Sequence, residues 1–246
     1  MNIKKSIPNI LTLLNLLSGT IAVIFAVQGE LVLAAYLVFL GIFFDFFDGF
    51  AARLLNVQGE LGKQLDSLAD VVTSGVVPGI VMFQLLKTKN TLEIFNTAII
   101  SWESQKIEFL PYVGLLITLA AAYRLAKFNI DVRQTSSFIG LPTPAASLVV
   151  LSLPLILEFS SFDFAVSVIE NKWVLVAVTL ILSFLMNAEI PLFSLKFKKY
   201  TWKDNKIKFI FVAVTVLLVA VFQFIAIPIV ILLYIFLSLF YKENKL

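Results

Sequence analysis

The 246-residue sequence contains no cysteine and no histidine. Without cysteine the chain has no thiol nucleophile and no disulfide, and without either residue it lacks the usual ligands of a zinc site. Histidine is also the commonest general base, so any proton transfer must use a carboxylate, a lysine or a tyrosine. Any bound metal ion must have oxygen ligands, which favours magnesium, manganese or calcium.

Charge is scarce as well. Only 14% of the residues are charged, against about 25% in ordinary soluble domains, whereas 60% are hydrophobic and 24 are Phe. The mean hydropathy of +0.97 and the long runs of Leu, Ile and Val are typical of a polytopic helical membrane protein. Because these runs are nearly continuous, we expect an all-α integral membrane protein with a single transmembrane domain over residues 1–246.

Eight apolar stretches are expected to form a bundle of transmembrane helices. They lie at about residues 8–27, 31–55, 61–87, 110–128, 138–159, 173–193, 209–226 and 227–241. Pro142 and Pro144 would open the fifth helix, because proline is tolerated where backbone N–H groups have no partner. Pro228 would mark the turn between the last two helices. The segment 94–102 is expected to be interfacial or re-entrant.

The basic residues are distributed unevenly about these spans. With eight spans, both chain ends share a side with 15 of the 19 Lys and Arg residues. The other side receives only Lys87, Lys89, Lys106 and Lys172. The positive-inside rule therefore predicts a multi-pass protein of the cell membrane with both termini on the cytoplasmic side.

One polar stretch, residues 45–70, interrupts the apolar sequence and contains Asp45, Asp48, Asp66 and Asp70. A carboxylate at membrane depth is costly unless it is paired, hydrated or bound to metal. The first two aspartates are three residues apart and the last two are four apart, so each pair shares a helix face. The two helices are sequential and therefore antiparallel neighbours by default. Their acidic faces would meet near the cytoplasmic boundary and repel each other unless one or two divalent cations lay between them.

Small and basic side chains accompany the aspartates. Gly49 and Ala52 lie one turn along the same helix and leave space for a ligand against the backbone. Arg53 supplies a bidentate phosphate donor. Oxygen-ligated metals beside such groups would hold and polarise a pyrophosphate.

The first helix carries its own polar face, because Asn9, Thr12 and Asn15 recur at a spacing of three. Two interpretations fit this face. It either forms hydrogen bonds between helices within the membrane or forms a polar wall of a hydrated pocket.

The polar stretch matches the pattern D-x2-D-G-x2-A-R-x8-G-x3-D-x3-D at Asp45, Asp48, Gly49, Ala52, Arg53, Gly62, Asp66 and Asp70. The chain thereby resembles the CDP-alcohol phosphotransferase family. The resemblance implies a six-helix core at about residues 8–194, with the helices of residues 209–241 outside it. It also implies transfer of a phosphatidyl or similar group from a CDP-linked lipid to an alcohol, with release of CMP.

Roles for individual residues follow from the same resemblance. Two divalent metal ions, magnesium or manganese, would be bound by Asp45, Asp48, Asp66 and Asp70, and Asp70 would also be the general base. The CDP-lipid would be bound by Gly49, Ala52, Arg53 and Gly62, and the polar face of the first helix adds Asn9 and Thr12 to this binding site. The family resemblance further suggests a homodimer in the lipid bilayer, and no nucleic-acid partner is expected.

Three further stretches resemble the membrane-embedded phosphatidylserine synthases: PNILTLLNLLSG at residues 8–19, RLAKFN at 124–129 and FIGLPTPAA at 138–146. This resemblance implies CDP-diacylglycerol and L-serine as substrates. The carboxylate of serine would need a cation, for which the candidates are Arg124, Lys127 and Arg133, assisted by Asn129. The same basic residues also fit the role of ordinary anchors at the cytoplasmic boundary.

Other acceptors remain open within the family, namely glycerol 3-phosphate, inositol or inositol phosphate, as does an archaeal CDP-linked ether lipid as donor. A phosphorylated acceptor would need a second anion pocket, and the few basic residues near the aspartates favour an unphosphorylated one. A cation transporter is disfavoured because the sequence has no internal repeat and its acidic cluster lies on one side of the membrane. Glu189, near the cytoplasmic end of the sixth span, is expected to pair with a basic residue.

Overall fold

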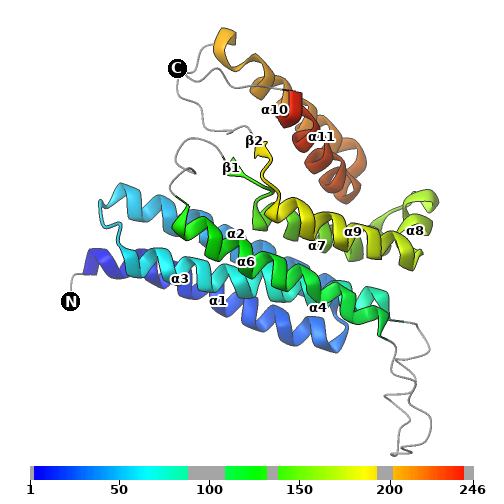
Figure 1. Ribbon diagram of the computed structural model, residues 1–246, viewed down its shortest axis with the longest axis horizontal. Helices are drawn as coiled ribbons and strands as arrows, with labels where there is room; N and C mark the ends of the chain where they lie inside the picture. Colours follow the sequence, from blue (N-terminus) through cyan, green and yellow to red (C-terminus); the bar gives the residue numbers. More distant parts are fainter. Residues whose placement is uncertain (1–2, 88–108, 132–137, 193–201, 241–246) are drawn as a thin grey trace, which may run out of the picture.

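The computed structural model describes residues 3–87, 109–131, 138–192 and 202–240, so the expected interfacial segment 94–102 lies outside the described residues. This part of the chain is almost entirely helical (Figure 1). The elements are α1 (Ile3–Gln28), α2 (Leu31–Leu54), α3 (Glu60–Asp70), the π-helical η1 (Val71–Val76), α4 (Val77–Leu86), the 3-10 helix η2 (Leu110–Leu115), α6 (Leu116–Ile130), β1 (Phe138–Ile139), α7 (Thr143–Phe159), α8 (Asp163–Glu170), α9 (Lys172–Asn187), β2 (Pro191–Leu192), α10 (Trp202–Phe222), η4 (Gln223–Ile225) and α11 (Ala226–Phe240). The expected all-α fold is confirmed.

Five helical stretches of the described chain are long and apolar enough to cross a membrane: Ser6–Gln28, Leu31–Leu54, Glu60–Leu86, Leu110–Ile130 and Asn205–Phe240. The number becomes six if α8 and α9, which are bent by 78° relative to each other, count as one span. Each of the eight expected apolar stretches is largely helical. The counts differ because α7 has only 17 residues and because Asn205–Phe240 is one stretch that contains both α10 and α11.

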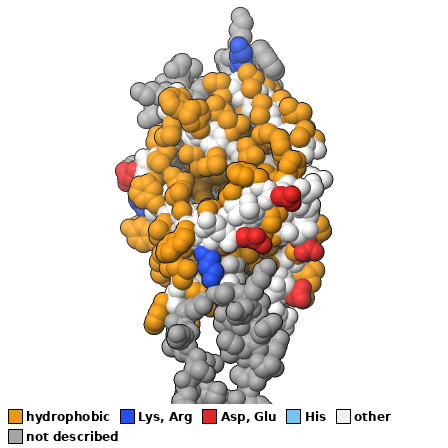
Figure 2. Space-filling model, turned by 90° about the vertical axis from the view of Figure 1, so that its right-hand side faces the viewer, with side chains coloured by type: hydrophobic (Ala, Val, Ile, Leu, Met, Phe, Trp, Pro, Cys, Tyr) orange, Lys and Arg blue, Asp and Glu red, His pale blue; other side chains and the backbone are white. Residues whose placement is uncertain are grey.

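The outer surface of these helices is apolar. Large side chains such as Leu17 (54% exposed), Phe46 (64%) and Phe184 (68%) point away from the protein interior. Figure 2 looks onto the right-hand end of the bundle in Figure 1, where hydrophobic side chains predominate and charged ones are few. Water-soluble monomers rarely expose apolar surface on this scale, so lipid is the natural surrounding of the bundle.

Small residues allow the first three long helices to pack closely. A Cβ atom added to Gly41 of α2 would lie 2.7 Å from Thr73 Cγ2 and 2.8 Å from Asn15 Oδ1, and one added to Gly19 of α1 would collide with Thr73. Membrane helices associate through such small-residue contacts, because apolar side chains gain little by leaving lipid. The junction of Gly19, Gly41 and Thr73 therefore fixes α1, α2 and η1 at close range.

The stretch from α3 to α4 is one helix with a widened turn in its middle. Pro78 has no N–H group, and its ring would clash with the carbonyl of Ser74 in a regular α-helix. The chain accommodates Pro78 with the π-helical segment Val71–Val76 immediately before it. π-Bulges of this kind occur frequently at functional sites, and this one directly follows Asp70.

The fifth and sixth expected helices differ from the observed ones at their facing ends. Helix α7 begins at Thr143 rather than near residue 138, and α9 ends at Asn187 rather than near residue 193. Between them, β1 pairs antiparallel with β2, and Gly140 adopts a φ of +74° that favours glycine. Pro142 directly precedes α7 and Pro191 follows α9, and neither proline has an N–H group to donate to an intrahelical hydrogen bond.

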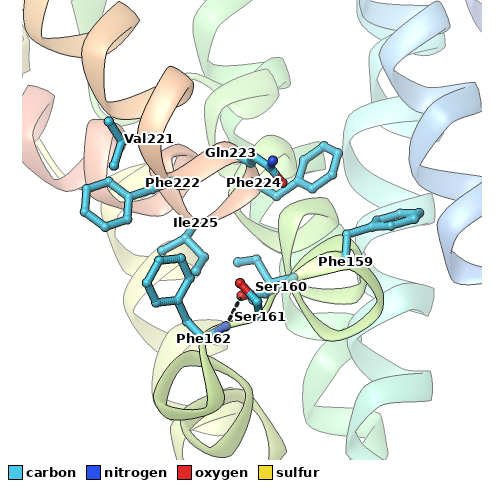
Figure 3. A pocket seen from close by; sticks show the side chains of 10 residues that line it. Phe159, Ser160, Ser161, Phe162, Val221, Phe222, Gln223, Phe224 and Ile225 are labelled. Carbon is cyan, nitrogen blue, oxygen red and sulfur yellow. Dashed lines mark hydrogen bonds between the residues drawn. The ribbon is translucent and has the colours of Figure 1, made fainter.

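The C-terminal helices form a hairpin. Gln223 has a positive φ of 49°, which reverses the chain five residues before Pro228, so the prediction that Pro228 marks the turn was wrong. The two arms meet where the Phe211 and Tyr234 rings lie 5.9 Å apart. The turn packs on the end of α7, where Phe159 faces Phe224 across a small crevice and the backbone N–H of Phe162 donates to Ser160 Oγ (Figure 3).

Candidate active site

The aspartates of the polar stretch come from two antiparallel helices. Residues 55–59 form the break between α2 and α3, and Asn56 has a positive φ of 53° that turns the chain. Asparagine tolerates this conformation better than most residues do. The reversal brings carboxylate oxygens of Asp45, Asp48 and Asp66 to within 4.8 Å of one another.

The fourth aspartate, Asp70, lies one turn further into the bundle and is only 8% exposed. It interacts electrostatically with Asp66 and Asp48. Its Oδ1 accepts a hydrogen bond from Asn15 Nδ2 at 3.3 Å. The backbone of Asn15 is held in turn by Thr73, whose hydroxyl donates to the Asn15 carbonyl oxygen at 3.3 Å.

The cluster of three aspartates has the chemistry of a site for a hard cation. Each member contributes carboxylate oxygens, which magnesium, manganese and calcium prefer as ligands. Asp45 and Asp66 are also within hydrogen-bonding distance of each other, and the Thr12 hydroxyl donates to Asp48. Asp48 is 6% exposed, so its negative charge needs a nearby positive partner. The residues present therefore fit a divalent metal ion.

A cavity of about 500 Å³ opens beside this cluster between the ends of α1, α2 and α3. Its polar and small lining residues include Asn9, Thr12, Asp48, Gly49, Ala52, Arg53, Gly62, Lys63 and Asp66. The Arg53 guanidinium lies over Gly49, where an added Cβ would be 3.5 Å from Nη1. Both interpretations of the polar face on the first helix are confirmed. Asn9 and Thr12 line the cavity, and Asn15 forms a hydrogen bond to Asp70 of α3.

Arg124 reaches the same region from α6. Its side chain is only 7% exposed, and its Nη1 donates to Thr143 Oγ1 at 3.1 Å. Arg124 also interacts electrostatically with Asp70. A buried arginine on the site side of the bundle is unusual for a simple membrane anchor, because anchors keep their charged heads in water.

The neighbours of Arg124 on α6 have other contacts. Lys127 forms an ion pair with Glu189 at 3.4 Å, so the expectation that Glu189 pairs with a basic residue is confirmed. Asn129 Nδ2 donates to Ser67 Oγ at 2.8 Å, and the Asn129 carbonyl accepts from Lys63 Nζ at 2.9 Å. These contacts fasten the end of α6 to α3 and to the segment after α9.

The structure thus gathers Asp45, Asp48 and Asp66 in one cluster and places Asp70 and Arg124 deeper in the bundle. Arg133 lies outside the described residues. The sequence interpretation did not foresee the contacts of Asn15 with Asp70 or of Thr143 with Arg124. The spacing of Asn15 from Thr12 was a signal for the first contact, whereas nothing in the sequence pairs residues 124 and 143.

Comparison with known proteins shows matches over much of the chain. The sequence model of the family described as CDP-alcohol phosphatidyltransferase matches residues 5–185. A CDP-diacylglycerol–serine O-phosphatidyltransferase of Bacillus subtilis is 35% identical over 152 residues, which are 59% of this chain and 75% of the relative. The Helicobacter pylori (strain 26695) enzyme of the same name is 29% identical over 197 residues, 79% of this chain and 74% of the relative. An archaetidylserine synthase of Methanothermobacter thermautotrophicus is 31% identical over 160 residues, 62% and 61% of the two chains.

Proposed function

The chain belongs to the CDP-alcohol phosphatidyltransferase family, and on this premise we propose that it transfers the phosphatidyl group of CDP-diacylglycerol to the hydroxyl of L-serine, which yields phosphatidylserine and CMP. The names of the relatives support this choice of substrates. The observation that carries the proposal is the convergence of Asp45, Asp48 and Asp66 within 4.8 Å beside a cavity that also contains Arg53.

The cavity is proposed to bind the CDP part of the donor. Gly49, Ala52 and Gly62 leave room for the nucleotide, and an added Cβ at Gly62 would reach to 3.5 Å from Asn9 Oδ1. Arg53 offers its planar set of donors to the phosphates, which a guanidinium binds in a bidentate manner. The acyl chains would remain in the lipid, because the surrounding helices expose apolar side chains.

The aspartate cluster is proposed to hold two magnesium or manganese ions, with Asp45, Asp48 and Asp66 as ligands and Asp70 as a further one. Ions held by these aspartates would neutralise the charge of the pyrophosphate and stabilise CMP as the leaving group. Thr12 orients the Asp48 carboxylate through its hydrogen bond.

Asp70 is proposed to be the general base. Asn15 donates one hydrogen bond to its Oδ1, which leaves the second oxygen for the acceptor hydroxyl and a further lone pair of Oδ1 for a metal ion. Asp70 takes the proton of the serine hydroxyl while the serine oxygen forms a bond to the phosphorus on the lipid side. The bond from this phosphorus to the bridging oxygen breaks, and CMP leaves with the electron pair. A carboxylate in a buried position is suited to this role because water does not compete for the acceptor hydroxyl.

The site is proposed to face the cytoplasm in a multi-pass protein of the cell membrane. Arg53, Lys63 and Lys127 lie at the site end of their helices, whereas Lys87 and Lys172 lie at the opposite helix ends. The positive-inside rule assigns the first group to the cytoplasmic side. We also propose a homodimer and a single transmembrane domain whose core spans about residues 8–194, with α10 and α11 added outside it.

The test is an assay of CMP release by the purified full-length protein with CDP-diacylglycerol and Mg²⁺ or Mn²⁺. L-serine, glycerol 3-phosphate and inositol are offered separately, and we expect release only with serine. Asp66→Asn should be inactive, whereas Asp163→Asn, at an exposed position at the start of α8, should retain activity. Release with glycerol 3-phosphate or inositol and none with serine would refute the proposed acceptor. Release that persists in Asp66→Asn would refute the proposed site.

A further inference from the structure

Arg124 has more hydrogen-bonding capacity than the structure uses. A guanidinium carries five N–H donors, and Nη1 of Arg124 donates to Thr143. Within the described part of the chain, the buried Nε of Arg124 has no hydrogen-bond partner. An unsatisfied donor of a buried charged group is costly, which indicates that the group binds a ligand.

The charge of Arg124 is not neutralised by direct contact with Asp70. Both residues are described, and they interact electrostatically without an ion pair between them. Asp70 has Asn15 as its hydrogen-bond donor instead. A cation and a candidate base therefore stand near each other with separate partners, which suits a small molecule that carries an anion at one end and a hydroxyl at the other.

Helix α7 contributes further donors beside Arg124. It begins at Thr143, and the N–H groups of Thr143 and Ala145 in its first turn lack intrahelical partners. Pro144 has no N–H group, and Ala146 donates to the Pro142 carbonyl oxygen at 3.1 Å. Ser147 lies one turn further on the same face and is fully buried. Among the described residues its Oγ also has no hydrogen-bond partner. An arginine, two hydroxyls and a helix N-terminus all favour a negative charge at the same place.

We propose that Arg124, Thr143, Ser147 and the first turn of α7 bind the carboxylate of a β-hydroxy amino acid whose hydroxyl lies at Asp70. This inference rests on the proposed function and specifies which part of the acceptor is recognised. A carboxylate carries one negative charge, which one guanidinium neutralises. Lys127 and Asn129 serve in this assignment to hold α6 in place, because their side chains bind Glu189 and Ser67.

The experiment compares L-serine with L-serinamide, which keeps the hydroxyl and the ammonium but lacks the carboxylate charge. The full-length protein is assayed for CMP release with each acceptor, and kcat/KM is determined for the wild type, Arg124→Gln and Ser147→Ala. Ser152→Ala is the matched control, because Ser152 is buried on the same helix but donates to the Val149 carbonyl oxygen at 2.7 Å. The KM for CDP-diacylglycerol is measured in every variant.

The wild type should prefer serine over serinamide on the order of a hundredfold, which is the range of a hydrogen-bonded charge pair. Arg124→Gln should reduce this preference to a few-fold through a higher KM for serine, with the KM for CDP-diacylglycerol unchanged. Ser147→Ala should reduce it by roughly tenfold or less, as expected for one hydrogen bond, and Ser152→Ala should not change it.

Equal losses for both acceptors in Arg124→Gln would show a structural role for Arg124 and overturn the inference. A wild-type preference that persists in Arg124→Gln would overturn it as well, while the proposed function would stand. If Arg124→Gln does not fold, an unchanged preference in Ser147→Ala decides against the inference. A wild type that uses no serine at all would refute the proposed function itself, and this inference with it.

Discussion

The three-aspartate cluster predicts that divalent cations control the stability of the protein. The carboxylate oxygens of the cluster lie within 4.8 Å of one another, and two charges at this upper limit repel each other by about 3.5 kcal/mol at an effective dielectric constant of about 20. A cation that binds the folded state among all three removes this repulsion. At a concentration a hundred times its dissociation constant, it adds about 2.7 kcal/mol to the free energy of unfolding. For a chain of this length that corresponds to a rise in Tm of about 5–10 °C.

The assay is thermal unfolding of the purified protein in detergent, followed by intrinsic fluorescence after treatment with EDTA and during titration with Mg²⁺ or Mn²⁺. In Asp66→Asn the cation should raise the Tm by much less, because one of the three ligands is lost. The EDTA-treated form of this variant should also unfold at a higher temperature than EDTA-treated wild type, because two of the three repulsive pairs are gone. Asp163→Asn, at the start of α8, should respond to the cation like wild type. A wild-type Tm that does not depend on the cation, or an equal rise in Asp66→Asn, would refute the metal site.

Three other predictions concern the base, the packing and the α6 contacts. Asp70→Asn should lower kcat by about 10²–10⁴-fold while CDP-diacylglycerol still binds, as measured by CMP release and by binding of the donor; near-normal turnover would exclude Asp70 as the base. Gly114→Ala should cost about 1–3 kcal/mol of stability, because its Cβ would lie 2.6 Å from the backbone nitrogen of Phe83, and an unchanged Tm would contradict this packing. Lys127→Met should cost less than about 1 kcal/mol, because its ion-pair partner Glu189 is 64% exposed and water screens the pair, and a large loss of Tm would show a stronger role.

The helices and the acidic cluster were largely predictable because both depend on local spacing. Apolar runs of sufficient length specify membrane helices. At the break between the second and third helices, α2 ends at Leu54 and α3 begins at Glu60, each within one residue of the expected bound. The spacings of three and four residues placed each pair of aspartates on one face, and a short connection made the two helices antiparallel. The structure brings Asp45, Asp48 and Asp66 together in this arrangement.

The errors lie where backbone interactions, rather than hydropathy, decide the structure. Residues 138–142 and 188–192 are apolar enough to extend α7 and α9, but their prolines and Gly140 stop the helices, and the freed backbone groups pair between β1 and β2. Similarly, Pro228 is tolerated within the first turn of α11, where its missing N–H has no consequence. The turn of the hairpin falls instead at Gln223, a residue whose type gives no signal for a positive φ.

The acidic cluster was predictable from the sequence, whereas the contacts of the proposed acceptor site were not. The acidic cluster is formed by two helices joined by a short break, so sequence spacing is enough to infer its geometry. The proposed acceptor site is formed by α6, α7 and α3, which carries Asp70. Contact between Arg124 and Thr143 requires the end of α6 and the start of α7 to lie side by side, and no sequence spacing specifies this. Only tertiary packing determines that Arg124 is buried while Lys127, three residues later, reaches solvent. The residues proposed to decide the acceptor of this chain therefore lie at the contact between α6 and α7.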